Sequence, residues 1–566
     1  MICGPDKTSP ASGASEIAAH AAEQVLGPNP FIGLRPADIL ATLKSLGDAA
    51  FKSPGLVWRY DTDLVASLFK IMSGKSELTV PKEDRRFTDP TWAENPAYRG
   101  ILQFYLAWNT AMDDFIERTA LDNVTKERAR FVISLISDAV SPTNMLLGNP
   151  AALRKAMDTG GKSLVDGMKN MIDDLTNNGG MPSQVDKTAF EPGRNLALTP
   201  GAVVWRNEVL ELIQYEPQTK DVYARPQLIV PPQINKFYVF DLAPGKSIIE
   251  FLVKSGLQVF TVSWRNPVAE HRNWNMDTYV SALLQAIDVM RDITDAEDVN
   301  LHGACSGAVT LVGLLAYLAA KKRRFVHAAT LMVAVLDTEA ESLLGLFATK
   351  ESIAAAKAAS GLHGVLEGSE MGRVFAWMRP NDLVWNYWVN NYLMGNQPPI
   401  FDVLYWSNDS TRLPAAFHAQ LLDIFSDRQL QRPGAFKVLD TPVDLGMIDL
   451  DKFVVAGVTD HITPWKGVYN SLRMFGGKAE FVLSSSGHIQ SLVNPPTNLK
   501  AKYFSGEKLL DTPDAWLAAA EQQSGTWWEM WSKWIFERSG DLRPAPTGLG
   551  NARHKPGDKA PGTYIR

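Results

Sequence analysis

The chain has 566 residues, of which 45% are hydrophobic and 21% charged, a composition typical of globular proteins. Its formal net charge of -6 argues against a nucleic-acid-binding protein, which normally carries an excess of lysine and arginine. The chain contains no run of 18 uncharged apolar residues, and its first residues lack the basic start and apolar core of a signal peptide. We therefore expect a cytoplasmic protein without a transmembrane segment.

The first 200 residues have the apolar spacing of helices. Apolar side chains recur every three to four positions over residues 36–46 and again over 100–112, which predicts amphipathic helices. A polar, glycine-containing stretch at 173–182 and the Leu198-Thr-Pro-Gly201 corner interrupt this pattern. We predict a mainly helical N-terminal domain over residues 1–200. Cys3 lies in its polar start, far from the second cysteine, Cys305, so no structural disulfide is expected.

The pattern changes from about Val203, where short β-rich runs begin to alternate with helical ones. Strands are predicted at 228–230, 237–240 and 259–264, with helices from 246 and over 277–291. Later predicted strands cover 328–335, 453–457 and 479–486, a final helix covers 527–536, and a mobile tail starts at Gly540. This alternation predicts an α/β domain over residues 201–566, built on a mostly parallel sheet.

Strand alternation stops over residues 337–445, a segment rich in aromatic side chains such as Trp377, Trp385, Trp388 and Trp406. An insertion between late strands is best interpreted as a cap over the active site. The aromatic residues are also compatible with a second small core or a dimer interface, and we expect these uses to coexist.

Residues 299–308 predict a strand that runs into Gly303-x-Cys305-x-Gly307 and then into a helix. This is the pattern of a nucleophile elbow, in which two glycines permit a strained turn that exposes the nucleophile at the end of a parallel strand. Here the nucleophile position holds cysteine. The short motif alone has little specificity, so the rest of the chain has to support it.

A reactive thiol needs a base, and the base needs a carboxylate to orient it. Asp460 and His488 follow two late predicted strands, in the chain order of nucleophile, acid and histidine. His461 is the main rival base, but it is adjacent to Asp460 and we expect it to assist or to form a structural hydrogen bond. His302 and His327 lie in buried strands and are expected to be core residues, whereas His20 and His554 lie in expected tails.

The expected roles follow from this triad. His488 accepts the Cys305 proton, and Asp460 fixes the tautomer of the ring. The oxyanion is expected to bind the backbone amide of Ser306 and one amide near Gln233 and Ile234. No metal or other cofactor is expected. Because thioester exchange on a thiolate is close to thermoneutral, cysteine suits a transferase better than a hydrolase.

Several separate motifs resemble the polyhydroxyalkanoate synthases, and most closely their class II. They lie between about Val203 and Pro496: the stretches 206–215, 230–236 (VPPQINK), 262–267 (VSWRNP), 303–307 (GACSG), 404–406 with 411–414, 460–465 (DHITPW) and 486–491 (SGHIQS). One position departs from the family pattern, because Ala308 stands where a further glycine is usual.

The resemblance implies an α/β-hydrolase fold with a cap insertion, preceded by the helical N-terminal domain. It implies an acyltransferase that polymerises (R)-3-hydroxyacyl-CoA, with the medium-chain preference of class II, into polyester and releases CoA, which is substrate and not cofactor. The family triad maps onto Cys305, Asp460 and His488; Trp406 and His461 are candidate substrate-binding residues. The implied partners are the growing polyester, the granule surface and a second subunit in a homodimer, in the cytoplasm.

Three alternatives remain at this point. A short-chain synthase of class I would differ in substrate preference, and a thiol-dependent esterase or depolymerase would use water in place of a hydroxyacyl group. A non-catalytic granule coat protein is the third, and the ordered triad argues against it.

Overall fold

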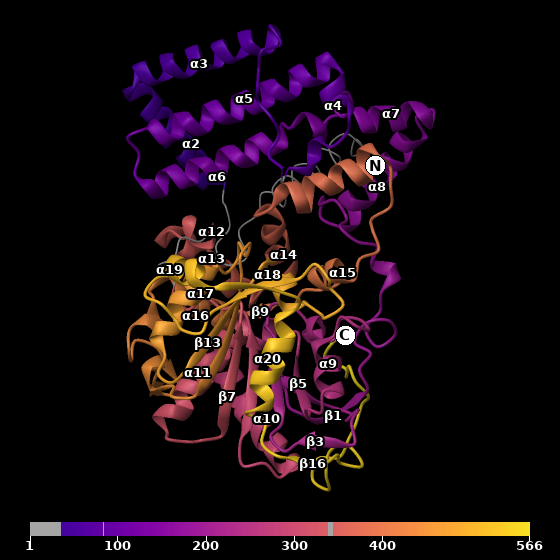
Figure 1. Cartoon of the computed structure of the whole chain (residues 1–566), viewed down its shortest axis with the longest axis vertical. Coiled ribbons are helices and arrows are strands. Elements are labelled where there is room, and N and C mark those ends of the chain that lie inside the picture. The colour runs from indigo at the N-terminus through magenta and orange to yellow at the C-terminus, as the bar shows by residue number, and fades with distance from the viewer. Residues whose placement is uncertain (1–35, 83, 338–342) are drawn as a thin grey trace, which may run out of the picture. The chain divides into compact units, whose positions relative to one another are not determined.

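The computed structural model describes residues 36–82, 84–337 and 343–566, so Cys3 and His20 lie outside the described residues. The chain divides into two compact units (Figure 1). The first runs to Asp186 and also contains Arg373–Ile400; the second consists of Lys187–Gly372 and Phe401–Arg566. The expected cap region, 337–445, is therefore divided between the two units.

The first unit is helical, as its apolar spacing predicts. Three small cores hold it together, one around Leu46 and Phe115, one around Trp92 and Leu102, and one around Met181 and Val384. The helices expected at 36–46 and 100–112 are α2 and α5. The elements are α2 (Pro36–Lys52), α3 (Pro54–Met72), α4 (Thr91–Glu94), α5 (Pro96–Arg118), α6 (Asn123–Ala139), α7 (Pro150–Asp158), α8 (Lys162–Asn177) and the π-helical turns η6 (Asn381–Trp385) and η7 (Trp388–Leu393), with η1 (Arg85–Phe87) and η2 (Pro142–Asn144) between them.

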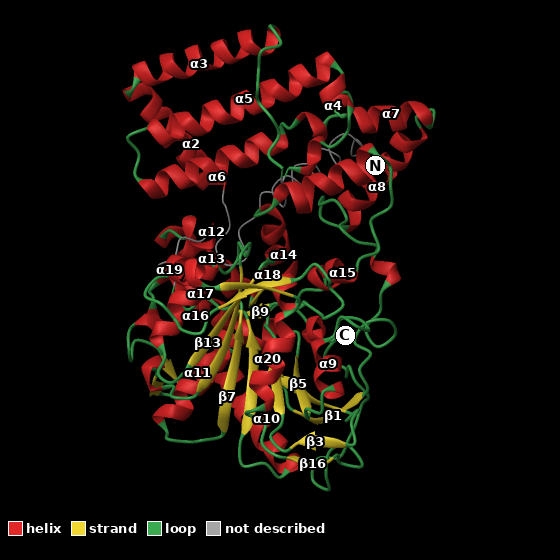
Figure 2. Ribbon diagram, viewed as in Figure 1, coloured by secondary structure: helices red, strands yellow, loops and turns green. Residues whose placement is uncertain are grey.

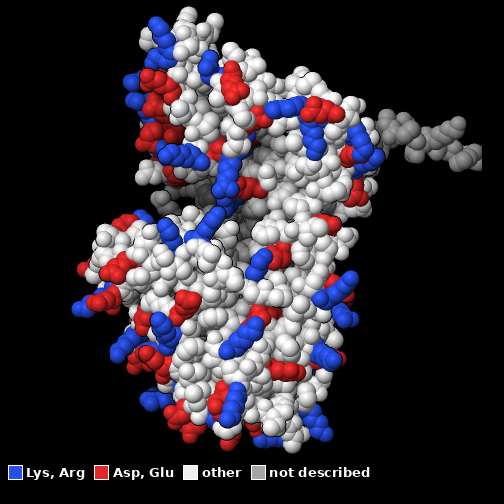
Figure 3. Space-filling model, turned by 45° about the vertical axis from the view of Figure 1, so that its right-hand side comes forward, with Lys and Arg blue, Asp and Glu red and all other residues white. Residues whose placement is uncertain are grey.

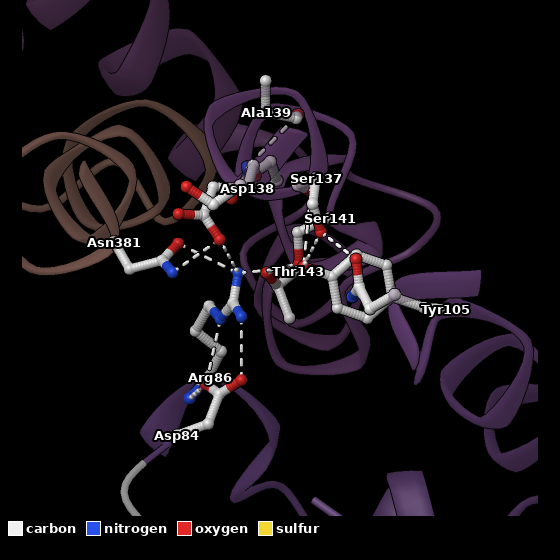
Figure 4. Close-up of polar contacts among 12 residues, drawn as sticks. Asp84, Arg86, Tyr105, Ser137, Asp138, Ala139, Ser141, Thr143 and Asn381 are labelled. Atoms are coloured by element: carbon white, nitrogen blue, oxygen red, sulfur yellow. Dashed lines mark hydrogen bonds and ion pairs between the residues drawn. The ribbon is translucent and has the colours of Figure 1, made fainter. Parts of the chain in front are cut away.

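A cluster of charged and amide side chains joins Arg373–Ile400 to the N-terminal helices of this unit (Figure 4). Arg86 pairs with Asp84 at 2.8 Å and with Asp138 at 3.2 Å, and it donates a hydrogen bond to Asn381 Oδ1 at 2.9 Å. Asn381 Nδ2 in turn donates to Asp138 at 2.7 Å. Burial alone would lower the pKa of Arg86, but the bond to Asp84 and the nearby carboxylates raise it above its usual value.

The second unit is built on a mixed sheet (Figure 2). Among the described residues its strand order is β1-β2-β5-β4-β6-β7-β12-β13-β14-β15. The strands from β5 to β13 in this order run parallel, whereas β1, β2, β14 and β15 pair antiparallel. The strands are β1 (Gly201–Arg206), β2 (Leu210–Tyr215), β4 (Gln227–Val230), β5 (Val259–Trp264), β6 (Val299–Ala304), β7 (Val326–Met332), β12 (Asp451–Gly457), β13 (Ala479–Ser484), β14 (Lys502–Ser505) and β15 (Glu521–Ser524).

Helices cover this sheet and complete its core. α20 (Trp527–Phe536) lies in front of the strands in Figure 2, and its tryptophans share one buried cluster with α9 (Ile248–Lys254) and the strands. α10 (Met276–Thr294) packs on α11 (Ser306–Ala320). The remaining elements are α12 (Leu343–Leu346), α13 (Lys350–His363), α15 (Asp402–Asn408), α16 (Ala415–Ser426), α17 (Trp465–Ser471), α18 (His488–Leu492), α19 (Pro513–Ala519), and the short strands β3 (Asp221–Tyr223), β8 (Val365–Leu366), β9 (Leu413–Pro414), β10 (Lys437–Val438), β11 (Thr441–Pro442) and β16 (Leu542–Pro544). α14 (Gly368–Trp377) begins in this unit and passes into the first unit at Arg373.

Three expected features of this unit are wrong. His327, expected in the core, is exposed near the start of β7. Residues Phe237–Phe240 form a 3-10 helix, η4, and not a strand. All four side chains are buried, and a short apolar run of this kind does not distinguish a strand from a helical turn. The tail from Gly540 is also not detached: β16 pairs with β3, and the carboxylate of Glu211 binds the backbone of Thr563.

Charges of both signs are interspersed on the face drawn in Figure 3, and the described residues form no continuous basic surface there. This agrees with the charge balance of the sequence. None of the helices in the described ranges is both long and apolar enough to cross a membrane.

Candidate active site

The elbow around Cys305 is a strained turn between β6 and α11. Cys305 has φ 50° and ψ -126°, a conformation that costs a residue with a side chain about 1–3 kcal/mol. Both neighbouring glycines are required by close packing. A Cβ at Gly303 would lie 2.9 Å from the Cα of Ala308, and one at Gly307 would lie 2.6 Å from the carbonyl oxygen of Val230. The strand therefore delivers the cysteine to the N-terminus of α11, as the motif predicts.

Asp460 and His488 meet at the same edge of the sheet, beyond the carboxyl ends of β12 and β13. His488 Nδ1 and Asp460 Oδ2 are 2.7 Å apart, and the side chain of Asp460 is fully buried. Asp460 accepts three more bonds, from the amides of Ile462 and Thr463 at 2.9 Å and from the Thr463 hydroxyl at 2.6 Å. Two acceptor sites on each carboxylate oxygen are therefore filled.

Asp460 and His488 stabilise each other's charged forms. Burial lowers the pKa of His488, but the charge of Asp460 and hydrogen bonds to Asp460 and Cys305 outweigh burial and raise it to about 10. Burial raises the pKa of Asp460, yet the charge and hydrogen bond of His488 bring it below its usual value. Because Nδ1 is bonded to Asp460, the other ring nitrogen is left for the thiol, which makes His488 suitable as the proton acceptor.

The loop after β4 lies against the start of α11. The amide of Gln233 donates to Ser306 Oγ at 3.0 Å, so this amide is already engaged. Among the hydrogen bonds of the described residues, none is donated by the amides of Ile234 or Ser306. These two amides are the available donors for an oxyanion.

The other candidate residues have different surroundings. His461 is half-buried on the turn after Asp460, and the ring that bonds to Asp460 is that of His488. Trp406 is buried, and its indole nitrogen donates to the carbonyl of Lys236 at 2.7 Å. Sequence reasoning missed Thr463, although the Asp-x-x-Thr spacing is typical of a side chain that closes a turn on its own backbone.

The strand order, the elbow and the acid and histidine at successive strand ends define an α/β-hydrolase fold with cysteine at the nucleophile position. Residues 228–495 match the family model for the alpha/beta hydrolase fold, and residues 83–252 match the model for the N-terminus of poly-beta-hydroxybutyrate polymerase.

The similarity to curated relatives extends over nearly the whole chain. It is 49% identical over 550 residues to poly(3-hydroxyalkanoate) polymerase 1 of Ectopseudomonas oleovorans, covering 97% of this chain and 98% of that protein. It is 40% identical to the poly(3-hydroxyalkanoate) polymerase subunit PhaC of Cupriavidus necator, covering 90% of this chain and 87% of that protein. The chain belongs to the poly(3-hydroxyalkanoate) polymerase family of acyltransferases.

Proposed function

We propose that this enzyme polymerises (R)-3-hydroxyacyl groups from their CoA thioesters into a polyester, with Cys305 as the residue that carries the acyl group. The observation that carries the proposal is the chain of contacts from Cys305 through His488 to the buried Asp460. The names of the relatives support the polymer product.

The chemistry follows from the positions of the groups. His488 takes the proton of the Cys305 thiol, and the sulfur attacks the thioester carbonyl. The carbonyl oxygen becomes an oxyanion, held by the amides of Ser306 and Ile234. The bond from carbon to the CoA sulfur then breaks, and CoA leaves with the proton from His488. In elongation, the 3-hydroxyl of a second hydroxyacyl group attacks the acyl-cysteine and loses its proton to His488, which forms the ester and frees the thiol.

We assign Asp460 an orienting role in both steps. Its two oxygens already accept four hydrogen bonds, and its pKa lies below the usual range. A carboxylate in this state is a poor proton acceptor for an incoming hydroxyl.

We propose a medium-chain substrate, as the resemblance of the sequence motifs to the class II synthases implies. We further propose that the enzyme acts as a homodimer at the surface of polyester granules in the cytoplasm, as the family resemblance implies.

The test is CoA release from (R)-3-hydroxydecanoyl-CoA and (R)-3-hydroxybutyryl-CoA, with the product identified by mass. We expect polymer, formed faster from the longer substrate. Preference for the shorter substrate would indicate a short-chain synthase, and free hydroxy acid without polymer would indicate a hydrolase.

Replacing the nucleophile tests the mechanism. Cys305→Ala should abolish CoA release, because no other thiol lies in the described residues. Thermal unfolding should remain close to that of the unmodified enzyme, since only the sulfur is removed. Polymer formation by this variant would refute the acyl-cysteine.

A further inference from the structure

The loop that follows β4 is fastened by a segment far away in the sequence, Trp406–Thr411, which we call the strap. The amide of Thr411 donates to the carbonyl of Ile234 at 2.9 Å, and the hydroxyl of Thr411 donates to the carbonyl of Gln233. Next to Thr411, Ser410 forms a β-bridge with Asn235. At the other end of the strap, the indole nitrogen of Trp406 donates to the carbonyl of Lys236. The strap thus runs alongside the loop as a short strand.

A charged contact adds a second attachment. Asp409 pairs with Lys236 Nζ at 2.8 Å and accepts a hydrogen bond from the hydroxyl of Tyr238, also at 2.8 Å. These three side chains are mostly removed from solvent, with exposed fractions of 14% for Lys236 and 24% for Asp409. Bonds in such surroundings lose little to competition from water.

The opposite side of the loop is attached to α11. Gln233 is buried; its amide donates to Ser306 Oγ at 3.0 Å, and its side-chain nitrogen donates to Thr310 Oγ1 at 2.9 Å. The loop is therefore held between the helix that begins behind the nucleophile and the strap.

The hydrogen bond from the Thr411 hydroxyl to the carbonyl of Gln233 also constrains the direction of the Ile234 N–H. In a trans peptide, the C=O and the N–H point in opposite directions. The C=O of Gln233 and the N–H of Ile234 belong to the same peptide, so an anchor on the oxygen also fixes the direction of the hydrogen. Thr411 is 3% exposed, so solvent offers this carbonyl no ready replacement for the hydroxyl.

We propose that Thr411 is a positioning residue, which holds the Gln233–Ile234 peptide so that the Ile234 N–H faces the oxyanion formed on Cys305. This deepens the proposed function, because it rests on acyl transfer at Cys305. If the peptide is released, it can rotate, and the site then loses one of its two donors.

The test compares Thr411→Val with Thr411→Ser in the full chain. Valine has nearly the shape of threonine but no hydroxyl, whereas serine keeps the hydroxyl. We expect Thr411→Val to slow single-turnover CoA release by about 100-fold, the lower end of the loss of one oxyanion donor. Thr411→Ser should restore most of the rate. A Thr411→Val enzyme that acylates as fast as the unmodified enzyme overturns the proposal.

The rate at which iodoacetamide alkylates Cys305 distinguishes a misplaced oxyanion donor from a general distortion of the site. In that reaction the sulfur displaces iodide at a saturated carbon, so no oxyanion forms. The alkylation rate of Thr411→Val should therefore equal that of the unmodified enzyme. A parallel loss of alkylation and acyl transfer would contradict a specific effect on the oxyanion site.

A 4-nitrophenyl ester tests the role of Thr411 independently of the proposed polymerase activity. Acylation of Cys305 by the ester releases nitrophenolate through the same kind of oxyanion, but it involves no CoA. If the unmodified enzyme reacts with the ester and not with hydroxyacyl-CoA, the polymerase proposal fails. The role of Thr411 is then still decided by comparing the rates at which the Thr411→Val and Thr411→Ser variants release nitrophenolate.

Discussion

His302 lies in β6, three residues before Cys305, and its ring is a neutral member of the core. The residue is fully buried and has ring contacts with Phe240 and Trp531. Its Nε2 contacts the sulfur of Met332, and its Nδ1 has no hydrogen-bond partner among the described residues. Burial lowers the pKa of His302 to about 3. The sequence indicated a core imidazole at this position, and burial confirms it.

This burial predicts a dependence of stability on pH. The unfolded chain binds a proton at His302 below about pH 6.5, whereas the folded chain does so only below about pH 3, so stability is lost as the pH falls between these values. His302→Leu removes this titration. Between about pH 7.5 and about pH 5.5, the free energy of unfolding should fall by about 1.4 kcal/mol more in the unmodified enzyme than in the variant. Urea unfolding at the two pH values measures this; equal losses would contradict a neutral buried ring.

The proposed catalytic side chains could be predicted because each follows a buried strand within a recognisable local pattern. Cys305 comes directly after β6, and His488 and Asp460 follow β13 and β12 within a few residues. Thr411 could not be found this way. It meets Gln233 across 178 positions, and no local pattern specifies a contact made only by the folded chain.

At the scale of elements, the C-terminal segment shows how one buried carboxylate holds a tail in place. Glu211 in β2 is fully buried. Its Oε2 accepts bonds from the amides of Thr563 at 2.9 Å and Tyr564 at 3.0 Å, and its Oε1 binds the Thr563 hydroxyl and Arg206, both at 2.6 Å. The residues of the tail are polar and rich in proline and glycine, so composition alone suggested mobility. The partner that orders them lies about 350 residues earlier in the sequence.

We expect Glu211→Gln to release this tail. The amide group has only one acceptor oxygen and no charge, so the tail loses a hydrogen bond to a charged group, at a cost of about 1.5–3 kcal/mol. Tryptic cleavage after Lys559 should become at least about tenfold faster. Glu216→Gln is the matched control, because Glu216 is exposed just beyond the end of the same strand. Unchanged cleavage in Glu211→Gln would show that other contacts fix the tail.

The strands and helices that the sequence predicted best are those with unambiguous patterns. The β-rich run at 259–264 became β5 and the tryptophan-rich stretch at 527–536 became α20, with the expected bounds. The antiparallel strands β1 and β2 lie at one edge of the sheet, and β2 could not be recognised from the sequence. All its residues are buried, including the polar Glu211 and Gln214, so its sequence does not alternate between a buried apolar face and an exposed polar face.

At the scale of the whole molecule, the chain enters the second unit, returns to the first for Arg373–Ile400, and leaves it again. This returning segment is bound by polar contacts with the N-terminal helices. Asn170 Nδ2 donates to the carbonyls of Asn391 and Asn396 at 3.0 and 2.9 Å, and the hydroxyl of Tyr392 donates to Asp174 at 2.8 Å. The first unit therefore requires chain from both sides of residues 187–372, and its stability should depend on these contacts.

Arg86→Met tests this dependence. It removes the cation that pairs with Asp138 and bonds to Asn381, and a mostly buried carboxylate left without its partner destabilises a fold by about 3 kcal/mol. Amide hydrogens in η6 and η7 should then exchange about 100-fold faster, whereas those of β6 and β12 in the second unit should not change. Arg85→Met is the control, because Arg85 is exposed. Equal acceleration in both units would mean that the molecule opens as one cooperative body, and no acceleration in η6 and η7 would mean that the Arg86 cluster does not hold the returning segment.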